Sequence, residues 1–224
     1  MIEWIFPSIC GGCDGPLLPT EREICIRCLL DLPVTNFWHV PQKNEGYNRL
    51  APHVANLQGV ISGFWYVQGS PLRRWVHAAK YESRPQLLYG AARYMATLIA
   101  QESHVPLSEI QGLLPIPISP VRQRQRGYNQ AEWAARGLSE IWGIPLLRGQ
   151  WQRRPTTKSQ LTRNRIERWL ELESEFICTG TLPKVVGVVD DVLTTGATLA
   201  AATRVLPTTT AIWVFTIGIT QRRR

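Results

Sequence analysis

Two adjacent carboxylates and a threonine-rich turn follow an apolar segment near the end of the chain. Residues 185–189 are all apolar, and Asp190, Asp191 and the turn Thr194-Thr-Gly-Ala-Thr198 come after them. A buried strand of this kind delivers its last side chains to the edge at which open α/β sheets bind ligands. The turn leads into a helix whose free N–H groups and positive dipole end attract an anion. This pattern predicts a phosphate site.

The same residues indicate which phosphate compound binds. Gly196 lets the backbone approach a phosphate closely, and the hydroxyls of Thr194, Thr195 and Thr198 can add hydrogen-bond donors. The carboxylates repel a phosphate, so we expect them to bind the neighbouring hydroxyls of a ribose 5-phosphate or an adjacent divalent ion. The structural alternative is an aspartate that caps the next helix beside ordinary turn threonines. The chain has no GxxxxGK[ST] or GxGxxG motif, which gives triphosphate or dinucleotide binding no support.

Four cysteines near the start of the chain have the spacing of a metal site. Cys10-x-x-Cys13 and Cys25-x-x-Cys28 are separated by eleven residues. Two such turns supply the four thiolates of a tetrahedral Zn²⁺ with no open position, so we expect a structural role. The alternative is a disulfide or redox pair, but nothing around either turn resembles a thioredoxin-like context. Cys178 lies in an apolar context and is expected to be a packed thiol.

The positive charge of the chain is concentrated in one segment. Residues 121–170 contain eleven Arg or Lys against three Glu, which equals the whole net charge of +8, and the remainder has fourteen of each sign. Such a concentration favours an anionic partner. A solvated basic face is the alternative.

Apolar periodicity predicts an α/β fold with a parallel sheet flanked by helices. Strand, helix and strand at residues 184–189, 197–206 and 211–219 form a βαβ unit, which implies a right-handed crossover. Further strands are expected at 60–67 (broken near Gly63), 112–118 and 145–151, and helices at 71–81, 85–101 and 129–142, with a basic and then helical stretch at 156–170.

We expect three parts in the chain: a zinc ribbon at residues 1–35, a linker or irregular wrap at 36–58, and a ligand-binding domain at 59–224. The first part is too small and too poor in apolar periodicity to fold without metal. The chain has neither a long apolar run nor a signal-peptide pattern, so we expect a cytoplasmic protein without a membrane span.

In combination, these motifs closely resemble the ComF family, the competence-protein and GntX-like group of phosphoribosyltransferase-fold proteins. The resemblance covers essentially the whole chain, and its carriers are the four cysteines, Lys80-Tyr81, Pro115-Ile-Pro117, Arg126-Gly-Tyr-Asn-Gln130, Gln160-Leu161 and the Asp190 motif. It implies a zinc ribbon followed by a type I phosphoribosyltransferase-like domain. Two departures are Gly196-Ala197, where many members have Gly-Gly, and Tyr128, where Phe is common.

The resemblance also implies roles for particular residues. Asp190 and Asp191 would hold the ribose hydroxyls, Thr194, Thr195, Gly196, Ala197 and Thr198 the 5-phosphate, and Mg²⁺ would bind through the diphosphate of phosphoribosyl diphosphate. The loop Pro117–Val121 can offer N–H groups to that diphosphate, and a basic loop at Arg153–Arg165 can close over it. Arginine forks match diphosphate oxygens, and the candidate diphosphate or DNA contacts are Arg122, Arg124, Arg126, Lys158, Arg163 and Arg165.

Three functions remain open from the sequence. The resemblance favours a role in DNA uptake and natural transformation, with single-stranded DNA and the competence machinery as partners. An active phosphoribosyltransferase with a nitrogenous acceptor is the second, and a scaffold with a degenerate pocket is the third. For DNA, Tyr128, Trp151 and Trp169 lie among the basic residues and could provide stacking faces, whereas Trp133 and Trp142 are expected in the core.

Overall fold

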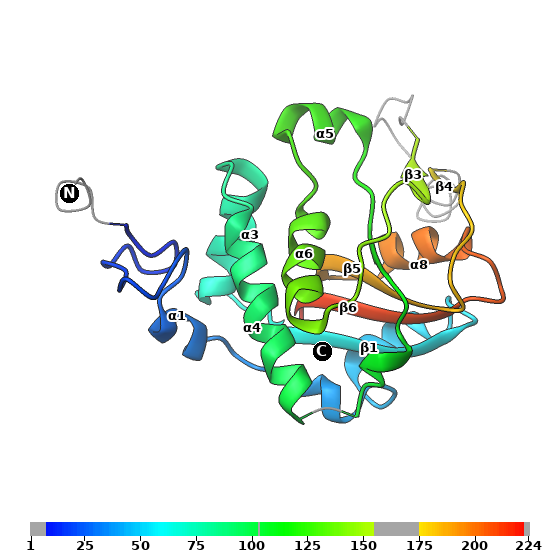
Figure 1. Ribbon diagram of the computed structural model, residues 1–224, viewed down its shortest axis with the longest axis horizontal. Helices are drawn as coiled ribbons and strands as arrows, with labels where there is room; N and C mark the ends of the chain where they lie inside the picture. The colour runs from blue at the N-terminus through cyan, green and yellow to red at the C-terminus, as the bar shows by residue number, and fades with distance from the viewer. Residues whose placement is uncertain (1–7, 103, 155–174, 222–224) are drawn as a thin grey trace.

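The structure is a computed structural model that describes residues 8–102, 104–154 and 175–221 (Figure 1). Its centre is a parallel sheet of four strands in the order β1-β6-β5-β2. The strands are β1 (Leu57–Trp65), β6 (Ala211–Ile219), β5 (Val185–Leu193) and β2 (Leu113–Pro115). The predicted α/β fold with a parallel sheet flanked by helices is confirmed.

Helices cover both faces of this sheet because its strands are apolar on both sides. Phe215 and Ile217 of β6 belong to the core cluster under α3 (Pro71–Tyr81), α4 (Gln86–Glu102) and α6 (Gln130–Trp142). Ile212 and Val214, which alternate with them, pack instead with α8 (Ala197–Arg204). The predicted bounds of α3 and β6 match the structure.

Three sequence expectations need correction. β1 continues through Gly63 without a break. The absence of a side chain at Gly63 leaves room for Met95 of α4, since a Cβ added at Gly63 would lie 2.7 Å from the Met95 Sδ. β5 does not stop at Val189 but continues through both aspartates to Leu193, hydrogen-bonded to β6.

The strand expected at 145–151 is also wrong. Leu146 makes only an isolated bridge to β2, since Pro145 lacks an N–H and Gly149 has a φ of +81°. A strand begins instead at Trp151: β3 (Trp151–Arg153) pairs antiparallel with β4 (Phe176–Cys178). The helical stretch expected at 156–170 lies outside the described residues.

The shorter elements lie between these. They are α1 (Ile26–Leu30), η1 (Phe37–His39), α2 (Glu45–Leu50), η2 (Leu107–Glu109) and α5 (Pro120–Arg126). The segment 36–58, expected as a linker or irregular wrap, contains η1 and α2 and the first residues of β1. Of the helices that the structure describes, none is both long and apolar enough to cross a membrane.

Candidate functional site at the carboxyl edge of the sheet

The acidic pair lies beside the end of the neighbouring strand. Pro115 of β2 is in register with Val189 of β5, and the Ile116 N–H donates to the Val189 carbonyl at 2.8 Å. Residues 117–119 therefore leave the sheet next to Asp190, and the expected loop Pro117–Val121 is helical from Pro120, where α5 begins. Two segments that are far apart in sequence meet at this edge, as expected for the carboxyl ends of parallel strands.

A lysine from α3 contacts the acidic pair. Lys80 Nζ lies 2.7 Å from Asp191 Oδ2, and the two side chains are 28% and 11% exposed. The Asp191 N–H donates to Asp190 Oδ1 at 2.8 Å, and the Val192 N–H donates to Asp191 Oδ1 at 2.7 Å. These contacts fix both carboxylates in place. The sequence marked Lys80 only as part of the family resemblance and gave no indication of this ion pair.

The two carboxylates differ in their environment. Burial is the largest effect on Asp190 and raises its pKa to about 7, and the charge of Asp191 acts in the same direction. The Asp191 N–H and the charges of Lys80 and Arg153 favour the ionised form but do not cancel the burial. Asp190 is therefore poised to lose a proton near neutral pH when a cation or a hydroxyl donor arrives.

The turn after β5 has the backbone that a phosphate cradle requires. Gly196 has a φ of +86° and precedes the first residue of α8, and a Cβ on it would lie 2.8 Å from Leu50 of α2. Only glycine suits such a position. Thr194 and Thr195 are exposed, and the first turn of α8 has N–H groups without intrahelical acceptors.

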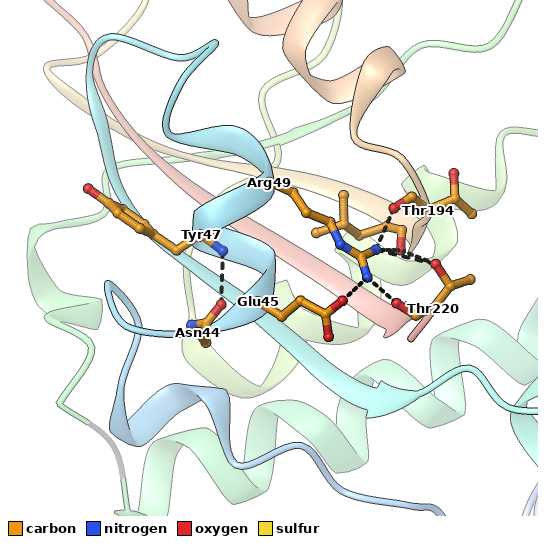
Figure 2. A network of polar contacts seen from close by, with 7 residues as sticks. Asn44, Glu45, Tyr47, Arg49, Thr194 and Thr220 are labelled. Atoms are coloured by element: carbon orange, nitrogen blue, oxygen red, sulfur yellow. Dashed lines mark hydrogen bonds and ion pairs between the residues drawn. The ribbon is translucent and has the colours of Figure 1, made fainter. Parts of the chain in front are cut away.

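A buried arginine, Arg49, is hydrogen-bonded to the residues at the start of this turn (Figure 2). The Arg49 guanidinium donates to the carbonyls of Leu193, Thr194 and Thr220, to the Thr220 hydroxyl and to Glu45. It thus ties α2 to the last residues of β5 and to the residue after β6. Sequence reasoning missed Arg49, because its partners at Thr194 and Thr220 lie 145 and 171 residues away and no local pattern announces them.

The corner Arg126–Gln130, which the sequence marked only as part of the family resemblance, joins two helices. Gly127 ends α5 with a φ of +80°, and the Asn129 side chain caps α6 by accepting from the Ala131 N–H. The Asn129 amide also donates to the Ile116 carbonyl at 2.8 Å, so the corner is tied to the end of β2.

Tyr128 links the same corner to α3. Its hydroxyl donates to the Ala79 carbonyl at 2.7 Å, and burial raises its pKa although the charge of Arg126 opposes that effect. The hydroxyl, which the common Phe would lack, therefore ties the corner to the turn of α3 that carries Lys80. Tyr128 is half-buried and held by its hydroxyl, so it is a poor stacking face.

The structure separates the predicted basic residues into three groups. Arg122 and Arg124 are exposed on α5, and Arg126 is half-buried at its end. Arg153 pairs with Glu175 at 2.6 Å and still influences Asp190. Lys158, Arg163 and Arg165 lie outside the described residues, as does Trp169.

Two of the other tryptophans of this segment contribute to the core. Trp151 is buried and donates to the Pro115 carbonyl at 2.9 Å, so it is not a stacking face for DNA. Trp142 is half-buried against Phe215 and donates to the Ala96 carbonyl. Trp133 was also expected in the core, but it belongs to neither core cluster and is half-buried, with the Arg136 guanidinium over its ring.

The four cysteines converge on one point. The Sγ atoms of Cys10, Cys13, Cys25 and Cys28 all lie within 4.8 Å of one another, and those of Cys13 and Cys25 are 3.8 Å apart. That distance is too long for a disulfide. It agrees with the edge of a tetrahedron of Zn–S bonds of ~2.3 Å, which is about 3.8 Å long.

The thiolate chemistry also fits a metal. The N–H groups of Gly12 and Cys25 each donate to Cys10 Sγ at 3.2 Å. Burial raises the pKa of Cys10, but these N–H donors together outweigh it and lower the pKa to about 7. Burial and the other thiols raise the pKa of Cys28, so a cation is needed to hold all four as thiolates. The module fits a zinc ribbon, and its cysteines can hold a metal such as zinc.

Fold and cysteine module together define the class of protein: a parallel α/β domain preceded by a small four-cysteine module that can hold a metal. No family model matches the chain. The chain is 32% identical over 211 residues to Competence protein F of Haemophilus influenzae. The matched region covers 88% of this chain and 90% of that protein. It is 38% identical over 92 residues to Competence protein ComFC of Streptococcus pneumoniae, covering 41% and 39% of the two chains. The chain belongs to the ComF family.

Proposed function

We propose that this protein binds a phosphoribosyl diphosphate-type ligand at Asp190, Asp191 and the turn Thr194–Thr198, and that it acts in DNA uptake during natural transformation. One observation carries the ligand assignment: a carboxylate pair and a helix-initiating turn occupy the same edge of a parallel sheet. Ribose hydroxyls donate to carboxylates, whereas a 5-phosphate accepts from backbone N–H groups and threonine hydroxyls.

The surrounding residues agree with an anionic ligand that carries a second phosphate group. Lys80 from α3 and Arg153 from β3 both act on the acidic pair, and the loop Pro117–Val121 begins beside it. A bound Mg²⁺ would supply further positive charge to the diphosphate, with the two aspartates as its oxygen donors in this chain.

The DNA role comes from the relatives. Both similar proteins are named as competence proteins, and one of them covers most of this chain. We propose that the chain contacts single-stranded DNA and works with the competence machinery in the cytoplasm, where free thiolates remain available to zinc.

An enzymatic reaction is the second candidate, and the cations around the acidic pair favour it. A nitrogenous nucleophile would form a bond to C1 of the ribose, and the bond from C1 to the diphosphate oxygen would break with its electron pair. A nucleophile that carries an N–H would release that proton to solvent. Lys80 and Arg153 would stabilise the departing diphosphate. Diphosphate release that depends on an added base or amine would support turnover. Ligand binding with no release for any acceptor would limit the protein to binding.

Thermal unfolding tests the site. Phosphoribosyl diphosphate with Mg²⁺ should raise the unfolding midpoint, because a ligand that binds only the folded state stabilises it by mass action. At a ligand concentration of a hundred times the dissociation constant, the free energy of unfolding should rise by ~2.7 kcal/mol. The double variant Asp190→Asn/Asp191→Asn should lose the shift. The exposed Glu109→Gln is the matched control and should keep it. An equal shift in the double variant would contradict the assignment.

A further inference from the structure

An exposed aromatic ring lies at the end of α3, next to the lysine of the acidic site. Tyr81 is 70% exposed, although it is held by two neighbours. The His77 ring centroid is 4.8 Å from that of Tyr81, and the Arg126 guanidinium lies over the Tyr81 ring at 5.7 Å. A ring that is held by an arginine and a histidine ring and yet open to solvent is preorganised to stack on another planar group.

A basic cleft lies along α3, and His77, which contacts the Tyr81 ring, is one of the residues that line it. The cleft has a volume of about 400 Å³ and lies between α3 and the cysteine module, which contributes Gly11 and Asp14. Arg73, Arg74 and Arg84 line it. Asp14 and Glu82 are its acidic residues, and Glu82 is paired with His77 at 3.1 Å. The arginines outnumber the carboxylates, and Arg126 adds a further positive charge at the ring.

The spacing along the helix makes one continuous path. Arg73, His77 and Tyr81 are four residues apart and all exposed, so they lie on one face of α3. Eight residues of helix span roughly 12 Å. At the spacing of ~3.4 Å per nucleotide of a stacked strand, this is the length of about three nucleotides.

We propose that Arg73, Arg74, His77, Tyr81, Arg84 and Arg126 form a contact surface for single-stranded nucleic acid, the α3 strip, on which an unpaired base stacks against Tyr81. The assignment rests on the proposed DNA role and gives it a place in the fold. It differs from the sequence expectation, which placed the stacking faces at Tyr128, Trp151 and Trp169. Trp151 is buried, Tyr128 is half-buried and held by its hydroxyl, and Trp169 lies outside the described residues.

Charge and aromatic chemistry together favour this partner. Single strands bind to grooves that combine positive charge with exposed aromatic rings, because every unpaired base has a face to stack. A duplex keeps its bases paired and cannot use Tyr81 in this way. An acidic peptide would use the arginines and would have no need of the ring.

The position of the strip connects it to the acidic site. Tyr81 directly follows Lys80, which contacts Asp191, so a strand bound along α3 passes beside the sugar-phosphate pocket. We infer that the strip leads one end of a single strand toward that pocket.

Binding of a fluorescent oligothymidylate to the full zinc-loaded chain, followed by anisotropy over a range of salt concentrations, tests the strip. Tyr81→Ala should weaken binding roughly 5- to 150-fold, the loss expected for one stacked base, without changing the salt slope. Tyr81→Phe should retain binding. Arg73→Ala/Arg74→Ala should weaken binding and lower the log–log salt slope by about 1.4, or ~0.7 for each phosphate that the variant no longer neutralises.

Controls separate this proposal from the proposed function. Lys43→Ala/Lys184→Ala also removes two positive charges, from exposed positions outside the strip, and should bind nearly as well as the wild type. Glu82→Gln should strengthen binding up to about fivefold, because a carboxylate beside the path repels phosphates. The strip variants should keep the thermal shift with phosphoribosyl diphosphate.

The outcomes are distinguishable. Wild-type binding that Tyr81→Ala and Arg73→Ala/Arg74→Ala leave unchanged would overturn the strip and leave the DNA role intact. No binding of the wild type at low salt would overturn both. Equal competition by polyglutamate, with no effect of Tyr81→Ala, would identify an acidic peptide as the partner and also overturn the strip.

Discussion

Replacing Asp190 by asparagine should make the ligand-free protein more stable, by an amount that grows with pH. The pKa of Asp190 is about 7 in the folded chain and near 3.9 when unfolded. Between these values the folded state binds more protons than the unfolded state, so ionisation of Asp190 costs stability as the pH rises. Asparagine is neutral at every pH and removes this cost.

The magnitude follows from the shift. Three pKa units correspond to roughly 4 kcal/mol, an upper bound that is reached only above pH 7. At pH 5.5 the Asp190 carboxylate is ionised in the unfolded chain and still largely protonated in the folded chain. About half of the full cost in stability is therefore present at that pH. The advantage of Asp190→Asn should therefore grow by about 2 kcal/mol from pH 5.5 to pH 8.

Urea unfolding of the two proteins at both pH values measures this difference. Any effect of pH on the cysteine module is common to the two chains and cancels. Asp191→Asn is the contrasting variant, because it breaks the ion pair with Lys80 and should lower stability at both pH values. The reasoning is refuted if the advantage of Asp190→Asn stays constant or shrinks as the pH rises.

Three further predictions concern the supports of the site. Arg49→Ala should cost about 3 kcal/mol or more in urea unfolding and weaken ligand binding, because it removes the hydrogen bonds that join α2 to Thr194 and Thr220; a cost below ~1 kcal/mol would contradict this role. Gly196→Ala should cost more than Gly69→Ala, since both have a positive φ but only Gly196 would meet a neighbour, and equal costs would argue against the close packing on Leu50. Removal of zinc by a chelator should release one metal ion per chain and lower the unfolding midpoint, because Cys10 and Cys28 share a core with α3 and α4; an unchanged midpoint would exclude a structural role for the metal.

Much of the fold could be predicted because its signals are local. The apolar run of β6 is bounded by turn residues, and α3 begins with Ser70 followed by Pro71, so both elements could be placed to the residue. The strand expected at 145–151 was wrong because the prediction rested on apolar residues such as Leu146 and Leu147 alone. Pro145 has no N–H to donate and Gly149 has a φ of +81°, so the segment makes an isolated bridge to β2 and no ladder.

The candidate site, too, has local features that could be predicted and long-range features that could not. Adjacent residues and their chemistry predict the cysteine module, the two aspartates and the turn at Gly196. The ion pair of Lys80 with Asp191 and the network of Arg49 depend on contacts across the chain, which no single segment announces. Tyr81 was visible in the sequence as part of the family resemblance, but its exposure beside His77 and Arg126 became apparent only in the structure.

Calorimetric titration with phosphoribosyl diphosphate and Mg²⁺ at pH 8, where Asp190 is ionised, tests the central claim most directly. The wild type should bind one ligand per chain, and ribose 5-phosphate should compete for the same site. In Asp190→Asn/Asp191→Asn the binding heat should disappear while the chain remains folded. Undiminished affinity in that variant, or no binding by the wild type, would contradict a sugar-phosphate site at this edge of the sheet.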